Sequence, residues 1–233
     1  MHVVAIVPAY QAAESIGAVV SDLIRLWPAS VDPPAVIVVD DGSTDDTGKC
    51  AEVAGATVVR HLHNRGKGAA LRTGLVHARE LGADAAVTVD ADGQHPAEEA
   101  VRLAEHPVAA TTLVLAVRDL AAAGAPRSSQ LSNRISNLFL SRFSGTDLRD
   151  TQCGLRRYPV EGTLALGASS DGYAYEAEVV LRAARAGWCI EQLPARVFYP
   201  APEERISHFH VVRDPARIIA AVLRTLADTT RRR

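Results

Sequence analysis

The densest acidic feature of this 233-residue sequence is the segment Val89–Pro96, which reads VDADGQHP. It places Asp90 and Asp92 directly after a run of small apolar residues that predicts a buried strand. Two neighbouring carboxylates at a buried strand end repel each other and lose hydration, so their ionised state needs a cation. Mg²⁺ and Mn²⁺ prefer such oxygen ligands and can bridge them to a diphosphate. The alternative is a solvated turn that caps a helix beginning at Pro96.

Two further loops carry residue types that suit a nucleotide. The acidic loop VDDGSTD at Val39–Asp45 also follows an apolar run, although its hydroxyl and carboxyl groups could instead cap the next helix. The loop NRGKGAA at Asn64–Ala70 opens a helical pattern and offers backbone amides and Lys67 to an anion, but it lacks the spacing of a phosphate-binding loop. Two acid-glycine loops at strand ends favour ligand binding over capping alone.

Apolar runs rich in Val, Ile and Ala predict the strands that must position these loops. We expect strands at Val3–Val7, Val36–Val39, Thr57–Val59, Ala85–Val89 and Thr112–Val117. Helical patterns alternate with them at Ala13–Leu26, Asp45–Ala54, Lys67–Leu81 and Pro96–Ala104. This alternation predicts an α/β fold with a mostly parallel central sheet flanked by helices on both faces. Ligands of such sheets bind beyond the carboxyl ends of the strands, where the loops Pro8–Glu14, Asp40–Thr44 and Asp90–Pro96 lie.

The second half of the chain is less regular. It predicts a mobile flap of small residues at Ala121–Pro126, helices at Ser128–Arg142 and Tyr175–Ala186, loop and strand over Gly145–Tyr158, and a strand at Cys189–Leu193. The segment Pro215–Thr229 predicts an amphipathic helix with Ile218, Ile219, Val222, Leu223 and Leu226 on one face and Arg213, Arg217 and Arg224 on the other. That helix either anchors the protein at a membrane surface or packs on the core. No linker or repeat divides the chain, so we expect one domain.

Composition narrows the classes of function. A net charge of −2 and a pI near 6.4 exclude the basic field that drives nonspecific nucleic-acid binding. Cys50, Cys153 and Cys189 are too few and too scattered for a disulfide framework, which suits a reducing cytosol. The longest apolar run, Pro107–Val117, is shorter than the ~20 residues of a membrane span. We expect a cytoplasmic protein, either soluble or peripheral on the inner face of the cell membrane.

The motifs, taken in order, resemble those of family 2 glycosyltransferases with the GT-A fold. They are VPAY with Glu14, VVDDGSTDDT, NRGKGAALRTGL, VDADGQHP, RDTQCGLRRY and the YEAE segment, and the resemblance is closest to the dolichol-phosphate mannosyltransferase-like branch. It implies a Rossmann-like half at 1–118 that binds a nucleotide-sugar, a smaller acceptor half at 119–212 and an amphipathic helix at 213–233. The sequence departs from this pattern in two respects: it shows no appended membrane helices, which many relatives have, and it carries RISHFH at Arg205–His210.

The resemblance also implies roles for individual residues. Candidate nucleotide-binding residues are Pro8, Tyr10, Glu14, Asp41, Lys67 and Asp90, and candidate metal ligands are Asp90, Asp92 and Gln94. Arg118 and Arg134 resemble the family's basic residues that contact phosphate. Gln152 and Arg205 are further candidate contacts to an acceptor phosphate, and Arg205 does not come from the resemblance. Asp92 and Asp150 are the candidate catalytic residues. His208 and His210 either contact the acceptor or belong to a surface turn.

The implied reaction is an inverting, Mg²⁺- or Mn²⁺-dependent transfer of a sugar from a GDP- or UDP-sugar to a lipid phosphate, such as a polyprenyl phosphate. A phosphate acceptor is already ionised, whereas a lipid or glycan hydroxyl needs a base. Asp150 is the first candidate base, and Glu176 and Glu178 are alternatives, although Glu178 could instead pair with Arg182. A nucleotidyltransferase that makes an NDP-sugar and a nonenzymatic nucleotide-sugar sensor are rival functions. The former would need a glycine-rich basic loop where VPAYQAAES stands.

Overall fold

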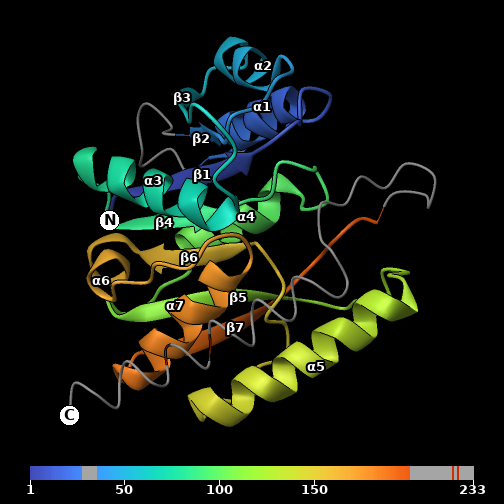
Figure 1. Ribbon diagram of the computed structural model, residues 1–233, viewed down its shortest axis with the longest axis vertical. Coiled ribbons are helices and arrows are strands. Elements are labelled where there is room, and N and C mark those ends of the chain that lie inside the picture. The colour runs from blue at the N-terminus through green and yellow to red at the C-terminus, as the bar shows by residue number, and fades with distance from the viewer. Residues whose placement is uncertain (28–35, 200–221, 223–224, 226–233) are drawn as a thin grey trace.

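The computed structural model describes residues 1–27, 36–199, 222 and 225, and in them one seven-stranded sheet carries helices on both faces (Figure 1). The strands are β1 (Val3–Ala9), β2 (Val36–Asp40), β3 (Thr57–Arg60), β4 (Ala85–Thr88), β5 (Thr112–Arg118), β6 (Arg156–Pro159) and β7 (Cys189–Ala195). Their order in the sheet is β3-β2-β1-β4-β6-β5-β7, and every pair is parallel except those that β6 forms with β4 and β5. The expected α/β fold with a mostly parallel sheet is confirmed.

The helices match the expected ones closely. They are α1 (Ile16–Leu26), α2 (Thr47–Val53), α3 (Lys67–Glu80), α4 (Ala97–Glu105), α5 (Arg127–Ser144), α6 (Val160–Ala165) and α7 (Ala174–Arg185). Helix α1 begins three residues later than expected because the amides of Ser15 and Ile16 both donate to the carbonyl of Ala12, which forms a turn there. Helix α6 has no counterpart among the expected elements.

The sheet separates two apolar cores because successive side chains of a strand point to opposite faces. In β1, Val4 and Ile6 join the core under α3 and α7, while Val3, Ala5 and Val7 join the core under α1 and α4. Strands β1, β2 and β4 are therefore buried on both faces and read as continuous apolar runs. Polar residues collect only where these strands end.

Strand β6 is the main feature that the sequence did not place. We expected a strand within Gly145–Tyr158, and β6 lies in the middle of the sheet between β4 and β5, antiparallel to both. This position brings the loop before β6, residues 150–155, to the carboxyl ends of β4 and β5.

Several expectations concern residues outside the described ranges. Arg205, His208, His210 and most of the terminal segment 213–233 lie there. Of that segment, Val222 is described, and it is fully buried in the core on the α3 and α7 face. The small-residue stretch Ala121–Pro126, expected as a flap, forms hydrogen-bonded turns in which the amides of Ala123 and Ala125 donate to the carbonyls of Asp119 and Leu120. No helix in the described ranges is long and apolar enough to cross a membrane.

Candidate functional site

The three loops that follow β1, β2 and β4 are joined by hydrogen bonds. Gln11, whose backbone adopts a positive φ of 51°, donates its amide to Ser43 Oγ at 3.0 Å and its side-chain nitrogen to Thr44 Oγ1 at 2.9 Å. Ser15 donates from Oγ to the carbonyl of Ala91 at 2.7 Å. The loops that the sequence marked for chemistry therefore form one surface at the carboxyl edge of the sheet.

Asp90, just beyond the end of β4, is paired with a lysine from the first turn of α3. Lys67 Nζ lies 2.6 Å from Asp90 Oδ1 and 3.4 Å from Glu176 Oε2 on α7. Burial opposes the charge on both partners, but the attraction of Lys67 lowers the pKa of Asp90, and Asp90 and Glu176 raise the pKa of Lys67. Lys67, a candidate nucleotide contact, thus binds one of the two carboxylates of Asp90 and Asp92, here called the acid pair.

Asp92 is the more accessible member of the acid pair. Its carboxylate reaches solvent on one side, while protein atoms on the other sides and the negative charge of Asp90 raise its pKa to about 6. The amide of Gln94 donates to Asp92 Oδ1 at 3.0 Å, and the carbonyl of Gln94 accepts from the amide of Phe198. The Asp90–Gln94 turn is thereby fixed with one carboxylate facing outward.

The loop before β6 packs directly on Asp90. A Cβ atom at Gly154 would collide with the Asp90 carboxylate, so only glycine leaves room for that side chain. Thr88 Oγ1 donates to the carbonyl of Gly154 at 2.6 Å and holds the two segments together. Arg156, fully buried at the start of β6, donates to the carbonyls of Cys153, Thr151 and Glu176.

Asp41 holds the loop that leads into α3. Its carboxylate accepts from the amides of Arg65 at 3.0 Å and Gly66 at 2.7 Å, and it lies 2.6 Å from His61 Nδ1. The Asp41 side chain is buried, and the contacts that the structure shows for it are those with His61, Arg65 and Gly66. Its role as a nucleotide contact stays a prediction. Of the other nucleotide candidates, Pro8 near the end of β1 and Tyr10 just after it are half-buried, and Glu14 is exposed in the turn before α1.

Asp150 and Arg118 form a two-point ion pair beside the acid pair. Arg118 Nε lies 2.7 Å from Asp150 Oδ2, its Nη2 lies 3.0 Å from Asp150 Oδ1, and its amide donates to Oδ2 at 3.1 Å. Asp150 is only 1% exposed. The positive charge of Arg118 also contributes to lowering the pKa of Asp90, which shows that the two pairs share one electrostatic environment.

A cleft of about 780 Å³ opens next to this ion pair and is rich in arginine. Its lining comes from α4, β5, α5, the end of β7 and the loops beside them, and includes Arg102, Arg118, Arg134, Arg149 and Arg196. Arg102 and Arg196 pair with Glu99, and Arg118 pairs with Asp150. Within the described ranges neither Arg134 nor Arg149 has an acidic partner, so the cleft presents uncompensated positive charge to an anion.

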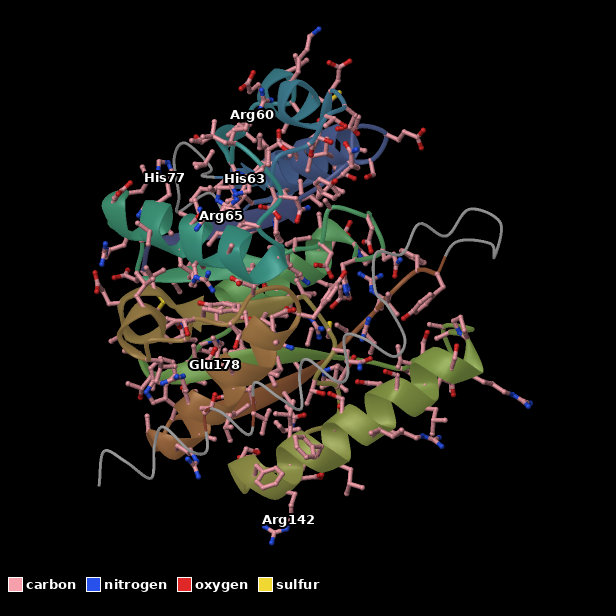
Figure 2. All side chains as sticks on the ribbon, in the orientation of Figure 1. Arg60, His63, Arg65, His77, Arg142 and Glu178 are labelled. Atoms are coloured by element: carbon pink, nitrogen blue, oxygen red, sulfur yellow. The ribbon has the colours of Figure 1, made fainter. Side chains whose placement is uncertain are left out.

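Two other acceptor-side candidates have protein partners. Gln152 donates from Nε2 to Ser132 Oγ at 3.0 Å, on α5. Glu178, on the part of α7 labelled in Figure 2, pairs with Arg182 at 2.7 Å and accepts from the amides of Ser169 and Ser170. The i, i+4 pair expected as the alternative for Glu178 is therefore present. Although burial opposes ionisation, the hydrogen bonds from Ser170 and Arg182 lower the pKa of this carboxyl, which makes it a poor base. Glu176 is buried between Lys67 and Arg156.

The residues present fit a hard divalent cation that arrives with a diphosphate. The described ranges contain no group of three His, Cys, Asp or Glu side chains that could hold a metal by itself. Mg²⁺, however, commonly takes only one or two protein carboxylates and completes its shell with water and substrate phosphates. Burial and the negative charge of Asp90 both raise the pKa of Asp92, and a bound cation would offset both effects.

Sequence reasoning missed Lys67 as the partner of Asp90, Gly154 as the residue that makes room for it, and the positions of Glu176 and Arg156. The glycine inside RDTQCGLRRY was a signal, because a glycine beside buried polar residues often marks close approach of another group. The pairing of Lys67 with Asp90 had no local signal.

Comparisons with known proteins agree on one family. The family described as Glycosyl transferase family 2 matches residues 4–161. The chain is 30% identical to the glycosyltransferase AglJ of Haloferax volcanii, over 93% of this chain and 69% of that protein. It is also 30% identical to an undecaprenyl-phosphate mannosyltransferase of Micrococcus luteus, over 83% of this chain and 82% of the relative.

Among solved structures, the fold is similar to glucosyl-3-phosphoglycerate synthase from Mycobacterium tuberculosis, crystallised with Mn²⁺, uridine diphosphate and phosphoglyceric acid. The TM-score is 0.72 at 22% identity, over 96% of this chain and 78% of that one. This likeness shows that the fold is of the GT-A type.

Proposed function

This chain belongs to glycosyl transferase family 2 and is a glycosyltransferase that uses a nucleotide-sugar, and we propose that its acceptor is a polyprenyl or related lipid phosphate, with inversion at the anomeric carbon. Membership of this family favours sugar transfer over the rival nucleotidyltransferase and sensor functions. The GDP- or UDP-sugar is bound, in this proposal, at the loops after β1, β2 and β4.

The observation that carries the proposal is the arginine-lined cleft, whose Arg118 also acts electrostatically on Asp90 and Asp92. Arg134 and Arg149 lack acidic partners in the described ranges, and Arg118 is held in place by Asp150. A guanidinium group grips phosphate through two parallel hydrogen bonds, so such a cleft suits an anionic acceptor better than an alcohol. The name of the Micrococcus luteus relative, which transfers mannose to undecaprenyl phosphate, supports the same class of acceptor.

The state of Asp150 also supports a phosphate acceptor. A hydroxyl acceptor requires a carboxylate with a free oxygen to take its proton. Asp150 is buried and both of its oxygens bind Arg118, and Glu178 is engaged by Arg182. Glu176 has one oxygen without a hydrogen-bond partner, but it is buried between Lys67 and Arg156 and does not line the cleft. We therefore propose that Asp150 orients Arg118 instead of acting as a base. A phosphate oxygen is already ionised and can displace the nucleoside diphosphate directly, from the face of the sugar opposite the leaving group.

Asp92, together with Asp90 and Gln94, would hold Mg²⁺ or Mn²⁺. When bound, such an ion neutralises the charge that develops on the departing diphosphate. Lys67 balances Asp90 and keeps the two carboxylates from repelling each other fully. The turn of Asp90–Gln94 and the packing of Gly154 keep these groups in place before the donor arrives.

Assays with paired acceptors test the proposal. Purified enzyme should transfer sugar from a GDP- or UDP-sugar to a short-chain, water-soluble polyprenyl phosphate, and not to the corresponding polyprenol. Excess EDTA should abolish turnover, and Asp92→Ala should lower it at least about 100-fold. Nuclear magnetic resonance of the first product from an α-linked donor should show a β linkage. Efficient transfer to the polyprenol, or an α product, would contradict the proposal.

The part played by Arg134 can be isolated from donor binding. Arg134→Ala should lower transfer to the polyprenyl phosphate at least about tenfold while the affinity for the nucleotide-sugar stays unchanged. Arg79→Ala, an exposed arginine on α3 far along the chain from the cleft, is the matched control and should change neither.

A further inference from the structure

Helix α5 presents aliphatic side chains to solvent, which an ordinary surface helix keeps on its buried face. Its protein-facing side is mixed: Leu140 is fully buried and Phe139 and Phe143 pack on the core, while three polar side chains bind the loop that follows the helix. Ser136 Oγ lies 2.8 Å from Thr151 Oγ1, Asn137 Oδ1 accepts from the Thr151 amide at 2.8 Å, and Ser141 Oγ accepts from the Leu148 amide at 2.9 Å. Its solvent-facing side carries three aliphatic residues. Leu131, Ile135 and Leu138 are 59%, 54% and 76% exposed.

These three residues form one continuous stripe. Their spacings of four and three residues place them on a single face of an α-helix. Arg127, Arg134 and Arg142 are exposed on the same side, and no Asp or Glu occurs anywhere in α5. Figure 2 shows Arg142 pointing away from the body of the protein at one end of the helix. The face defined by these six residues, here called the α5 face, is both apolar and uniformly basic.

No other stripe of exposed large apolar side chains occurs on a helix in the described ranges. The other large apolar side chains that are exposed in the described ranges are Met1, Val53, Leu62, Leu81 and Phe198, and they belong to different elements. Single exposed apolar residues are normal on a soluble surface, whereas a stripe flanked by basic residues is typical of a helix lying in a bilayer interface. Figure 1 places α5 along the edge of the molecule far from α1 and α2.

The α5 face is also continuous with the arginine-lined cleft. Gln130, Asn133, Arg134 and Asn137 line the cleft from the adjoining side of the same helix. An acceptor whose phosphate enters the cleft would therefore have its hydrocarbon chain beside Leu131, Ile135 and Leu138. The basic residues match the negative charge of anionic headgroups at the same level.

We propose that the α5 face docks the enzyme on an anionic lipid bilayer and presents the cleft to lipids held there. The choice of acceptor lipid rests on the proposed function, but the docking itself does not. The terminal segment 213–233 was the other expected membrane anchor. Its one described apolar residue, Val222, packs in the core and is therefore not available to a bilayer.

Vesicle flotation with a matched pair of triple variants tests the docking. The stripe variant is Leu131→Ser, Ile135→Ser and Leu138→Ser, and the control is Val53→Ser, Leu62→Ser and Leu81→Ser, which also removes three exposed aliphatic side chains. The wild-type protein and the control should float with phosphatidylcholine–phosphatidylglycerol vesicles. The stripe variant should bind them at least about tenfold more weakly. Circular dichroism melting curves establish that all three proteins are folded.

The charged part of the α5 face is tested separately. Arg127→Gln with Arg142→Gln should weaken binding to the anionic vesicles, and added salt should remove most of the difference from wild type. The pair Arg25→Gln with Arg79→Gln, on the donor side, is the control. Arg134 is left unchanged because it lines the cleft.

Activity assays separate this proposal from the proposed function. The stripe variant should lose at least about tenfold more activity on a long-chain polyprenyl phosphate embedded in vesicles than on a water-soluble, short-chain one, because only the embedded acceptor requires docking on the bilayer. If the wild type uses neither acceptor but the stripe variant still loses vesicle binding, the docking stands and the proposed acceptor is wrong. Docking is overturned if the wild type does not bind anionic vesicles, or if the stripe variant binds them equally. It is also overturned if the wild type binds no vesicles and sedimentation shows that it forms a dimer, which the stripe variant cannot form. A second copy of the chain would then cover the α5 face.

Discussion

The ammonium group of Lys67, in the first turn of α3, lies 2.6 Å from Oδ1 of Asp90 at the end of β4. This ion pair joins the Asn64–Ala70 segment to the acid pair. It also places a permanent positive charge beside a predicted metal ligand. Glu176 Oε2, 3.4 Å from the same nitrogen, adds a second negative charge on its other side. The protein thus contributes a cation of its own to the site, and four predictions follow from this and its neighbouring contacts.

Replacing Lys67 by methionine should destabilise the metal-free protein and increase its response to a divalent cation. The change keeps the length of the side chain but leaves Asp90 and Glu176 without their cation, which should lower the free energy of unfolding by about 2–4 kcal/mol. Thermal melting with and without Mn²⁺ measures both effects, and Lys49→Met, on the exposed side of α2, is the control. Equal melting temperatures for Lys67→Met and wild type would show that the ion pair does not matter for stability.

Replacing Asp92 by asparagine should stabilise the metal-free protein at neutral pH. The folded state raises the pKa of Asp92 from 3.8 to about 6, so the folded protein holds a proton there that the unfolded chain releases. Stability from this group therefore falls as pH rises through the window between these two values and stays low above it. The melting temperature of Asp92→Asn should exceed that of wild type at pH 7.5 and match it near pH 3.5. A constant difference across this range would contradict the raised pKa.

Replacing Gly154 by alanine should impair metal and donor binding. The new Cβ collides with the Asp90 carboxylate, which must move away from Lys67. We expect the affinity for a nucleoside diphosphate with Mn²⁺, measured by calorimetry, to fall at least about tenfold. Gly17→Ala is the control because the corresponding space in α1 is open, and this substitution should be neutral or stabilise the helix by up to about 1 kcal/mol. Unchanged diphosphate binding in Gly154→Ala would mean that Asp90 does not need its present position.

Replacing Asp150 by asparagine should weaken the acceptor site without removing the chemistry. The amide keeps the shape of the carboxylate but loses its charge, so Arg118 is held less firmly. The KM for a polyprenyl phosphate should rise at least about tenfold, while the KM for the donor changes less than about twofold. A large loss of kcat with an unchanged acceptor KM would instead assign Asp150 the role of a base.

Much of this molecule could be predicted from local sequence. The strands β1, β2, β4 and β5 follow from apolar runs that are buried on both faces of a parallel sheet, and the helices between them follow from their periodicity. Turn-forming and acidic residues at the strand ends identified the loops that meet at one edge. The motifs in those loops were sufficient to identify the family. The roles of individual residues toward nucleotide, metal and acceptor remain predictions.

The partners of these residues were decided only by the tertiary structure. Lys67 is 23 residues from Asp90 along the chain, and Arg118 is 32 residues from Asp150. The Lys67–Asp90 pair exists because the first turn of α3 reaches the end of β4. The Arg118–Asp150 pair exists because β6 enters the sheet between β4 and β5, which brings the loop before β6 to the end of β5. Helix α5 shows the same limit. Leu140 is buried as an apolar helix residue is expected to be, but Leu131, Ile135 and Leu138 face solvent, and polar side chains of α5 contact the 148–152 loop. Local periodicity determines which side chains share a face, but only long-range packing determines what that face contacts.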